Sequence, residues 1–278
     1  MKKCRVIKEV RSQSAIDGAG VHLVRVLGNN DVKDFDPFLM LDSFDTTNAS
    51  DYIAGFPMHP HRGIETITYL ISGEIEHEDS LGNKGSIHSG EAQWMTAGSG
   101  ILHQEMPQTS ERMLGFQLWL NLPRSEKMVE PNYMDITKEQ IALKRMEGAE
   151  IRVLSGSFEE ATGVTPRYLP ASIYDISLSK GRKIDIPVKP EETPFIFFME
   201  GDALIEGRRI LDKTAVLFDS GDSIAVHASP DSDSRFIFFS GRPLKEPISW
   251  GGPIVMNTQE ELMSAFDELR QGTFIKHK

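Results

Sequence analysis

Cysteine is nearly absent from this chain, since Cys4 is the only one in 278 residues. No internal disulfide can form, which is typical of a protein in a reducing compartment. Long apolar runs are also absent. None approaches the roughly 20 residues that cross a bilayer, and the chain starts with an alternating segment through Val6 and Lys8 instead of a signal-peptide core. We therefore expect a soluble cytoplasmic protein without membrane association, present in the nucleus as well if the source is eukaryotic.

Basic side chains are fewer than acidic ones. The chain has 30 Lys and Arg against 41 Asp and Glu, which gives a formal net charge of −11 and a pI near 5.2. Affinity for nucleic acid depends mainly on basic side chains that neutralise phosphates. Direct nucleic-acid binding is thus excluded, and any role in transcription would have to act through a protein partner.

Helix signals are few, and short segments of alternating apolar and polar residues recur along most of the chain. Glycine, proline, asparagine and aspartate separate them. This spacing is typical of an all-β sandwich or barrel. The clearest segments are residues 21–27, 38–41, 65–71, 114–120, 151–154, 173–178, 184–188, 195–199 and 235–239.

Two segments have helical features. Thr258 and Glu261 have the spacing of a capping box, apolar residues follow at helical intervals, and Gly272 is a typical stop. We expect an amphipathic C-terminal helix there. A shorter helix is expected over Lys138–Met146.

The sequence indicates an internal duplication. Tyr69–Gly73 is similar to Phe197–Gly201, and Ser89–Glu91 is similar to Ser220–Asp222, at separations of 128 and 131 residues. The second unit has no histidine or carboxylate at the positions that correspond, by these offsets, to His59, His61, His103 and Glu105 of the first unit. The residues at those positions are Pro187, Lys189, Ser234 and Phe236.

Two short segments each place metal-binding side chains two residues apart. They are His59-Pro60-His61 and His103-Gln104-Glu105. Residues i and i+2 of a strand point to the same face, and both segments lie in alternating patterns whose apolar residues share that face. Four inward-pointing ligands could therefore converge.

Three imidazoles and a carboxylate suit a first-row transition metal, with Fe(II) as our first expectation and Mn, Ni, Co, Cu or Zn as alternatives. A zinc-dependent deaminase is excluded, because its site needs a later Pro-Cys-x-x-Cys. A histidine on an apolar strand face often makes only hydrogen bonds. We interpret His77, His88 and His227 as structural or surface histidines, with the alternative for His77, which shares the inward parity, that it supports the site from nearby.

Longer strings carry a family resemblance. His59-x-His61-x3-Glu65 and Gly98-x-Gly100-x2-His103 resemble the two cupin motifs. More narrowly, the chain resembles the pirin family over nearly its whole length. The strings concerned are Asp36–Asp42, Phe56–Gly63, Gln93–Met106, Ser125–Pro131 and Ile248–Asn257.

The resemblance implies a bicupin, with two jelly-roll β-barrels and a short C-terminal helix. We expect a metal-binding barrel over residues 1–131 and a barrel without metal over residues 132–278. It also implies one metal ion, held by His59, His61, His103 and Glu105. The general cupin pattern would use Glu65 as a ligand, whereas pirins use the glutamate after the last histidine, so Glu65 is expected only near the site.

Two activities go with the family. One is the cleavage of flavonols such as quercetin with dioxygen, a quercetin 2,3-dioxygenase reaction in which Glu105 would also be the catalytic base. The alternative is a non-catalytic metal-binding regulator that binds transcription factors or metabolic enzymes. In either role we expect a monomer.

Overall fold

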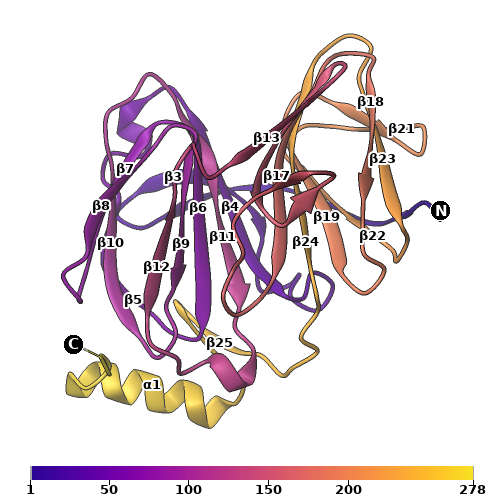
Figure 1. Ribbon diagram of the computed structural model, residues 1–278. Coiled ribbons are helices and arrows are strands. Elements are labelled where there is room, and N and C mark those ends of the chain that lie inside the picture. Colours follow the sequence, from indigo (N-terminus) through magenta and orange to yellow (C-terminus); the bar gives the residue numbers. More distant parts are fainter. Residues whose placement is uncertain (1, 278) are drawn as a thin grey trace. The chain divides into compact units, whose positions relative to one another are not determined.

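The computed structural model describes residues 2–277. It is mostly β-structure with one C-terminal α-helix, α1 (Gln259–Gln271), drawn in yellow in Figure 1. Within the described residues no helix has both the length and the hydropathy needed to cross a membrane. The chain forms two compact units, which we call the N-terminal barrel and the C-terminal barrel.

The N-terminal barrel contains residues 13–32, 38–137 and 244–277. Its large sheet has seven antiparallel strands and its small sheet has four. The large sheet has the order β12 (Asn132–Ile136), β9 (Glu91–Thr96), β6 (Ile64–Ser72), β11 (Met113–Asn121), β4 (Phe38–Thr46), β3 (Val21–Leu27) and β2 (Gln13–Asp17). The small sheet has the order β5 (Phe56–His61), β10 (Ile101–Pro107), β7 (Glu74–Asp79) and β8 (Lys84–His88). The hairpin β25 (Ser249–Gly251) and β26 (Ile254–Met256), the 3₁₀ turns Ala49–Asp51 and Arg124–Glu126, and α1 complete it.

The C-terminal barrel contains residues 2–12, 33–37 and 138–243. It also has a large sheet of seven strands and a small sheet of four. The large sheet has the order β1 (Val6–Arg11), β22 (Thr214–Phe218), β19 (Thr193–Glu200), β24 (Ser234–Gly241), β17 (Ala171–Leu178), β14 (Ala149–Ser155) and β13 (Ala142–Met146). The small sheet has the order β18 (Lys183–Pro187), β23 (Ser223–Ala228), β20 (Ala203–Ile205) and β21 (Arg208–Ile210). A short hairpin pairs β15 (Ser157–Phe158) with β16 (Ala161–Thr162).

Both barrels bury an apolar core between their sheets. In the C-terminal barrel, Phe198 and Phe236 of the large sheet lie in one cluster with Ile186 and Val226 of the small sheet. In the N-terminal barrel, Leu70 of the large sheet clusters with small-sheet residues. Burying each such side chain contributes roughly 1.5 to 3 kcal/mol. The alternating apolar segments of the sequence supply these inward faces.

The two barrels have the same strand arrangement. Reading both large sheets in order matches β12 with β1, β6 with β19 and β11 with β24, and reading the small sheets matches β5 with β18 and β10 with β23. This confirms the duplication. It also corrects our alignment of the halves, because Ser234 and Phe236 lie on β24, which matches β11, whereas the strand that matches β10 is β23.

Residues 142–146 form strand β13 and not a helix, because Glu147-Gly148, with Gly148 at φ +75°, turns the chain back into β14 so that Met146 pairs with Ala149. The single domain boundary after Pro131 stays a prediction, and both compact units are assembled from three segments of chain.

Candidate metal centre

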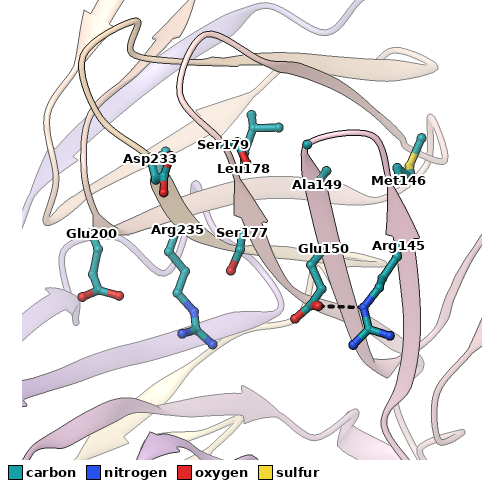
Figure 2. A pocket seen from close by; sticks show the side chains of 12 residues that line it. Arg145, Met146, Ala149, Glu150, Ser177, Leu178, Ser179, Glu200, Asp233 and Arg235 are labelled. Atoms are coloured by element: carbon teal, nitrogen blue, oxygen red, sulfur yellow. Dashed lines mark hydrogen bonds and ion pairs between the residues drawn. The ribbon is translucent and has the colours of Figure 1, made fainter.

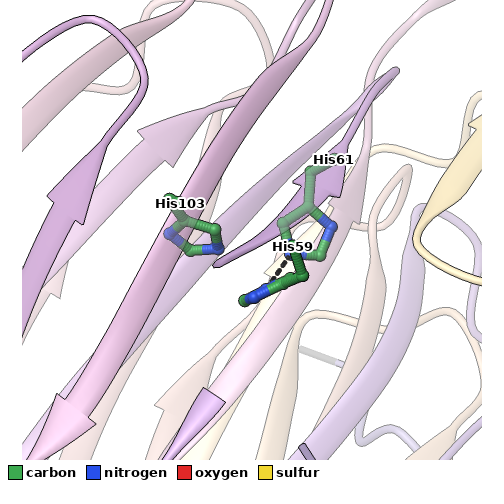
Figure 3. Close-up of side chains that lie close together, drawn as sticks. All are labelled: His59, His61 and His103. Atoms are coloured by element: carbon green, nitrogen blue, oxygen red, sulfur yellow. Dashed lines mark hydrogen bonds between the residues drawn. The ribbon is translucent and has the colours of Figure 1, made fainter. Parts of the chain in front are cut away.

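The candidate centre lies on the small sheet of the N-terminal barrel. Strands β5 and β10 pair antiparallel, with His103 opposite His59 and Ile101 opposite His61. This register brings the three histidines together, as Figure 3 shows. One ring nitrogen from each of His59, His61 and His103 lies within 4.8 Å of the others, and within residues 2–277 this is the group that could hold a metal ion.

Backbone carbonyls orient two of the rings. His59 Nδ1 lies 2.9 Å from the oxygen of Pro57, and His61 Nδ1 lies 3.1 Å from the oxygen of Pro253. A carbonyl can only accept, so each Nδ1 carries the hydrogen and each Nε2 presents a lone pair. The two Nε2 atoms are 3.0 Å apart. Two acceptors at this distance repel one another unless a proton or a cation lies between them.

His103 completes the group from β10. Its side chain is buried, and neither ring nitrogen has a hydrogen-bond partner among the described residues. Burial lowers the pKa of His103 well below its usual value, and burial together with His59 lowers the pKa of His61 to about 3. Both rings are therefore neutral at pH 7, which is the form that binds metals. The unpaired nitrogens fit a divalent first-row cation.

Glu105 lies on β10 two residues after His103, and both side chains are buried. Its carboxylate accepts hydrogen bonds from Gln117 Nε2, at 2.9 Å to each oxygen, and from Thr68 Oγ1 at 3.2 Å. It is not part of the 4.8 Å group formed by the histidines. Its role as fourth ligand and base stays a prediction.

Glu65 lies on β6 and is also outside the histidine group. Its carboxyl accepts a hydrogen bond of 2.7 Å from Thr96 Oγ1, and burial raises its pKa to about 7. His77 is buried on β7, stacks on Tyr133 and contacts Gln93. These contacts agree with a structural role for His77.

A cavity of about 540 Å³ opens beside His59 and His61. Trp119 and Trp250 line it together with apolar and charged side chains, and their ring centroids lie 5.8 Å apart. Sequence reasoning missed these residues because neither lies in the metal-binding motifs. The cavity is also lined by Arg25, Met40, Asp42, Phe56 and Gln117.

The C-terminal barrel has a cavity of about 560 Å³ of a different kind (Figure 2). Charged side chains line it, and several of them are paired within the barrel. Arg145 Nε lies 3.1 Å from Glu150, and Asp233 accepts a hydrogen bond of 2.8 Å from the Lys180 amide. No histidine lines this cavity. His227, on β23, and His88, on β8, are exposed.

Two family models match the chain. The pirin model matches residues 20–120, and the pirin C-terminal cupin domain model matches residues 173–275. A pirin-like protein of Caulobacter vibrioides is 41% identical over 273 residues, which cover 97% of this chain and 98% of that protein.

Solved structures of similar proteins have the same fold. A quercetin 2,3-dioxygenase of Acinetobacter baumannii is 30% identical with a TM-score of 0.90, and the match covers 98% of both chains. The bacterial pirin YhhW of Escherichia coli, crystallised in complex with nickel(II), is 23% identical with a TM-score of 0.65, over 85% of this chain and 98% of that one, and supports the fold. The chain therefore belongs to the pirin family and is a bicupin.

Proposed function

We propose that this protein is a metal-dependent dioxygenase that cleaves flavonols such as quercetin with dioxygen. The observation that carries the proposal is the histidine group beside a cavity with aromatic walls. His59 and His61 belong to both the group and the cavity lining. A relative at 30% identity is named a quercetin 2,3-dioxygenase, which supports the same reaction.

The residues proposed to hold the metal are His59 and His61 through Nε2, His103 through one ring nitrogen, and Glu105 as a fourth ligand. We propose Fe(II) as the metal. When bound, it would supply Lewis-acid and redox chemistry that links an electron-rich flavonol to dioxygen.

The cavity suits a flat aromatic substrate. Its volume of about 540 Å³ lies within the usual range of small-molecule sites. Phe56, Met40 and the two tryptophans supply apolar walls. Arg25, whose guanidinium is paired with the buried Asp42, supplies N–H donors that can hydrogen-bond to ring hydroxyls. These walls would orient the substrate ring and exclude water from it.

Glu105 is proposed to accept the proton of the flavonol hydroxyl. Thr68 and Gln117 hold its two oxygens, and Gln117 also lines the cavity. Gln117 thus connects the proposed base with the space in which a substrate would lie. The proton moves from the hydroxyl oxygen to a carboxylate oxygen and leaves the flavonol as an anion.

The test is to load the metal-free protein anaerobically with Fe(II), add quercetin, and admit oxygen. We expect oxygen uptake, loss of quercetin and release of carbon monoxide above a free-iron control. His103→Ala should abolish turnover, while His227→Ala, an exposed histidine of the other barrel, should leave it unchanged. Wild-type protein with confirmed iron content and no turnover would overturn the proposal and favour the regulatory role.

A further inference from the structure

Arg62 directly follows the ligand His61 and is buried, with 2% of its surface exposed. Its guanidinium donates to the oxygen of Ser99 at 2.7 Å and to the oxygen of Phe274 at 2.8 Å. It also forms an ion pair of 2.7 Å with Glu268 and lies 4.1 Å from the centre of the Phe274 ring. A buried charge is destabilising unless it is paired in this way. Three of its contacts are made by residues that follow it by more than 200 positions.

Lys127 makes a second connection at the same place. Its buried ammonium group donates to the oxygen of Gly63 at 2.8 Å, to the oxygen of Val255 at 2.9 Å and to Oδ1 of Asn121 at 2.5 Å. All three N–H groups of the ammonium are used. The turn after His61 and the C-terminal segment are therefore joined through one cation.

The backbones of the two segments also touch. The Val255 amide donates to the oxygen of Arg62 at 3.1 Å. Gly63 has φ +76°, and a Cβ at this position would lie 2.0 Å from the oxygen of Val255, so only glycine permits the approach. Two residues before Val255, the oxygen of Pro253 accepts the Nδ1–H of His61.

We propose that residues 253–276, which we call the brace, hold the His61 ring and the turn after it in the orientation that binds metal. Pro253 acts on the His61 ring directly, and Arg62, Lys127 and Glu268 are positioning residues that keep the brace in place. The proposal rests on the metal centre proposed above. Groups that orient a ligand typically change metal affinity 10- to 100-fold when they are removed.

The coupling between the docked brace and metal binding must act in both directions. If the brace raises the affinity of the site for a metal, the metal must stabilise the docked brace by the same factor. Metal binding should then protect the amides of residues 254–276 from hydrogen exchange.

The first test measures Co(II) affinity by competition with a chromophoric chelator, together with the visible absorption spectrum of the bound cobalt. Glu268→Gln leaves Arg62 without its carboxylate and should lower affinity about tenfold, with an altered spectrum. Asp267→Asn is the matched control, because Asp267 is the neighbouring helix residue and pairs with Arg270 instead of Arg62. It should change affinity less than twofold, and thermal unfolding of both metal-free variants reports whether they fold.

The second test needs no variant. Addition of Co(II) to wild-type protein should slow exchange in residues 254–276 about tenfold and leave β22 of the C-terminal barrel unchanged. Equal Co(II) affinity for both variants, or no added protection of residues 254–276 at full occupancy, would overturn the brace while leaving the metal centre intact. Loss of quercetin turnover alone would instead count against the proposed reaction. A wild-type protein that binds no Co(II) would overturn both proposals.

Discussion

At the scale of single residues, the centre depends on where each imidazole carries its hydrogen. The carbonyls of Pro57 and Pro253 draw the Nδ1 hydrogens of His59 and His61 away from the centre and leave two Nε2 lone pairs 3.0 Å apart. Such outer hydrogen bonds are the usual way in which proteins fix the metal-binding tautomer of histidine. A metal ion would relieve the repulsion between the lone pairs and use the unpaired nitrogens of His103.

Two glutamates compete for the role of fourth ligand, and substitution distinguishes them. Glu105→Gln should lower metal affinity roughly 10- to 100-fold, because Glu105 follows His103 on the same buried strand face. Glu65→Gln should lower it less, since the Glu65 carboxyl is bonded to Thr96 on the large sheet. Equilibrium competition for Co(II) measures both. If Glu65→Gln had the larger effect, the chain would follow the general cupin pattern.

Glu65 also predicts a pH effect on stability in the metal-free protein. Burial raises its pKa from 4.5 to about 7, so the carboxyl is neutral in both the folded and unfolded states below pH 4.5. Between pH 4.5 and 7 the unfolded chain releases this proton first, and the wild type loses stability relative to Glu65→Gln as the pH rises. Above pH 7 the relative loss is constant, about 3 kcal/mol.

Urea unfolding of the wild type and Glu65→Gln at pH 5 and pH 8 measures this difference. The variant should gain stability relative to the wild type at the higher pH. A difference between the two proteins that does not change with pH would show that Glu65 ionises in the folded state as easily as in the unfolded chain.

At the scale of elements, α1 begins with the capping box that the sequence indicates. Thr258 accepts from the Glu261 amide at 3.2 Å, and the Glu261 carboxylate accepts from the Thr258 amide at 2.9 Å. Thr258→Ala should cost about 1 kcal/mol of stability, because one amide at the helix start loses its acceptor. Thr258→Ser keeps the hydroxyl and should stay near the wild type in denaturant unfolding. Equal losses for both variants would contradict the capping explanation.

Local patterns predicted the elements that depend on local chemistry. Alternation indicated β6, and the i, i+2 spacing placed His59 with His61 and put His103 and Glu105 on one buried face. The same reasoning failed for β13, where the two-residue turn at Glu147-Gly148 overrides helix propensity.

The rest of the site depends on contacts that no local pattern encodes. Pro253 reaches His61 across 192 residues of sequence. The register of β5 against β10 shifts between His103 and Glu105, so Glu105 lies opposite Phe56. Gln117 comes to Glu105 from the large sheet. Only tertiary packing brings these groups to the centre.

At the scale of the whole molecule, two barrels share one strand arrangement, and only the N-terminal barrel contains a histidine group among the described residues. Elemental analysis of purified, metal-loaded protein should therefore give one metal per chain. His59→Ala combined with His61→Ala should give a folded protein without metal, because the apolar cores of the barrels do not include these rings. A second equivalent in the wild type, or one in the double variant, would contradict the assignment.

The assembly of each barrel from separate segments also sets a time during biosynthesis. A ribosome adds roughly 5 to 20 residues per second. Pro253 follows His61 by 192 positions, which therefore take about 10 to 40 seconds to translate. Once His103 has also been added, and until Pro253 follows, the nascent N-terminal barrel has its three histidines but lacks the carbonyl that orients His61. A metal ion captured early on the ribosome would meet an incomplete set of outer contacts, and tight retention would begin only after residue 253 has left the exit tunnel.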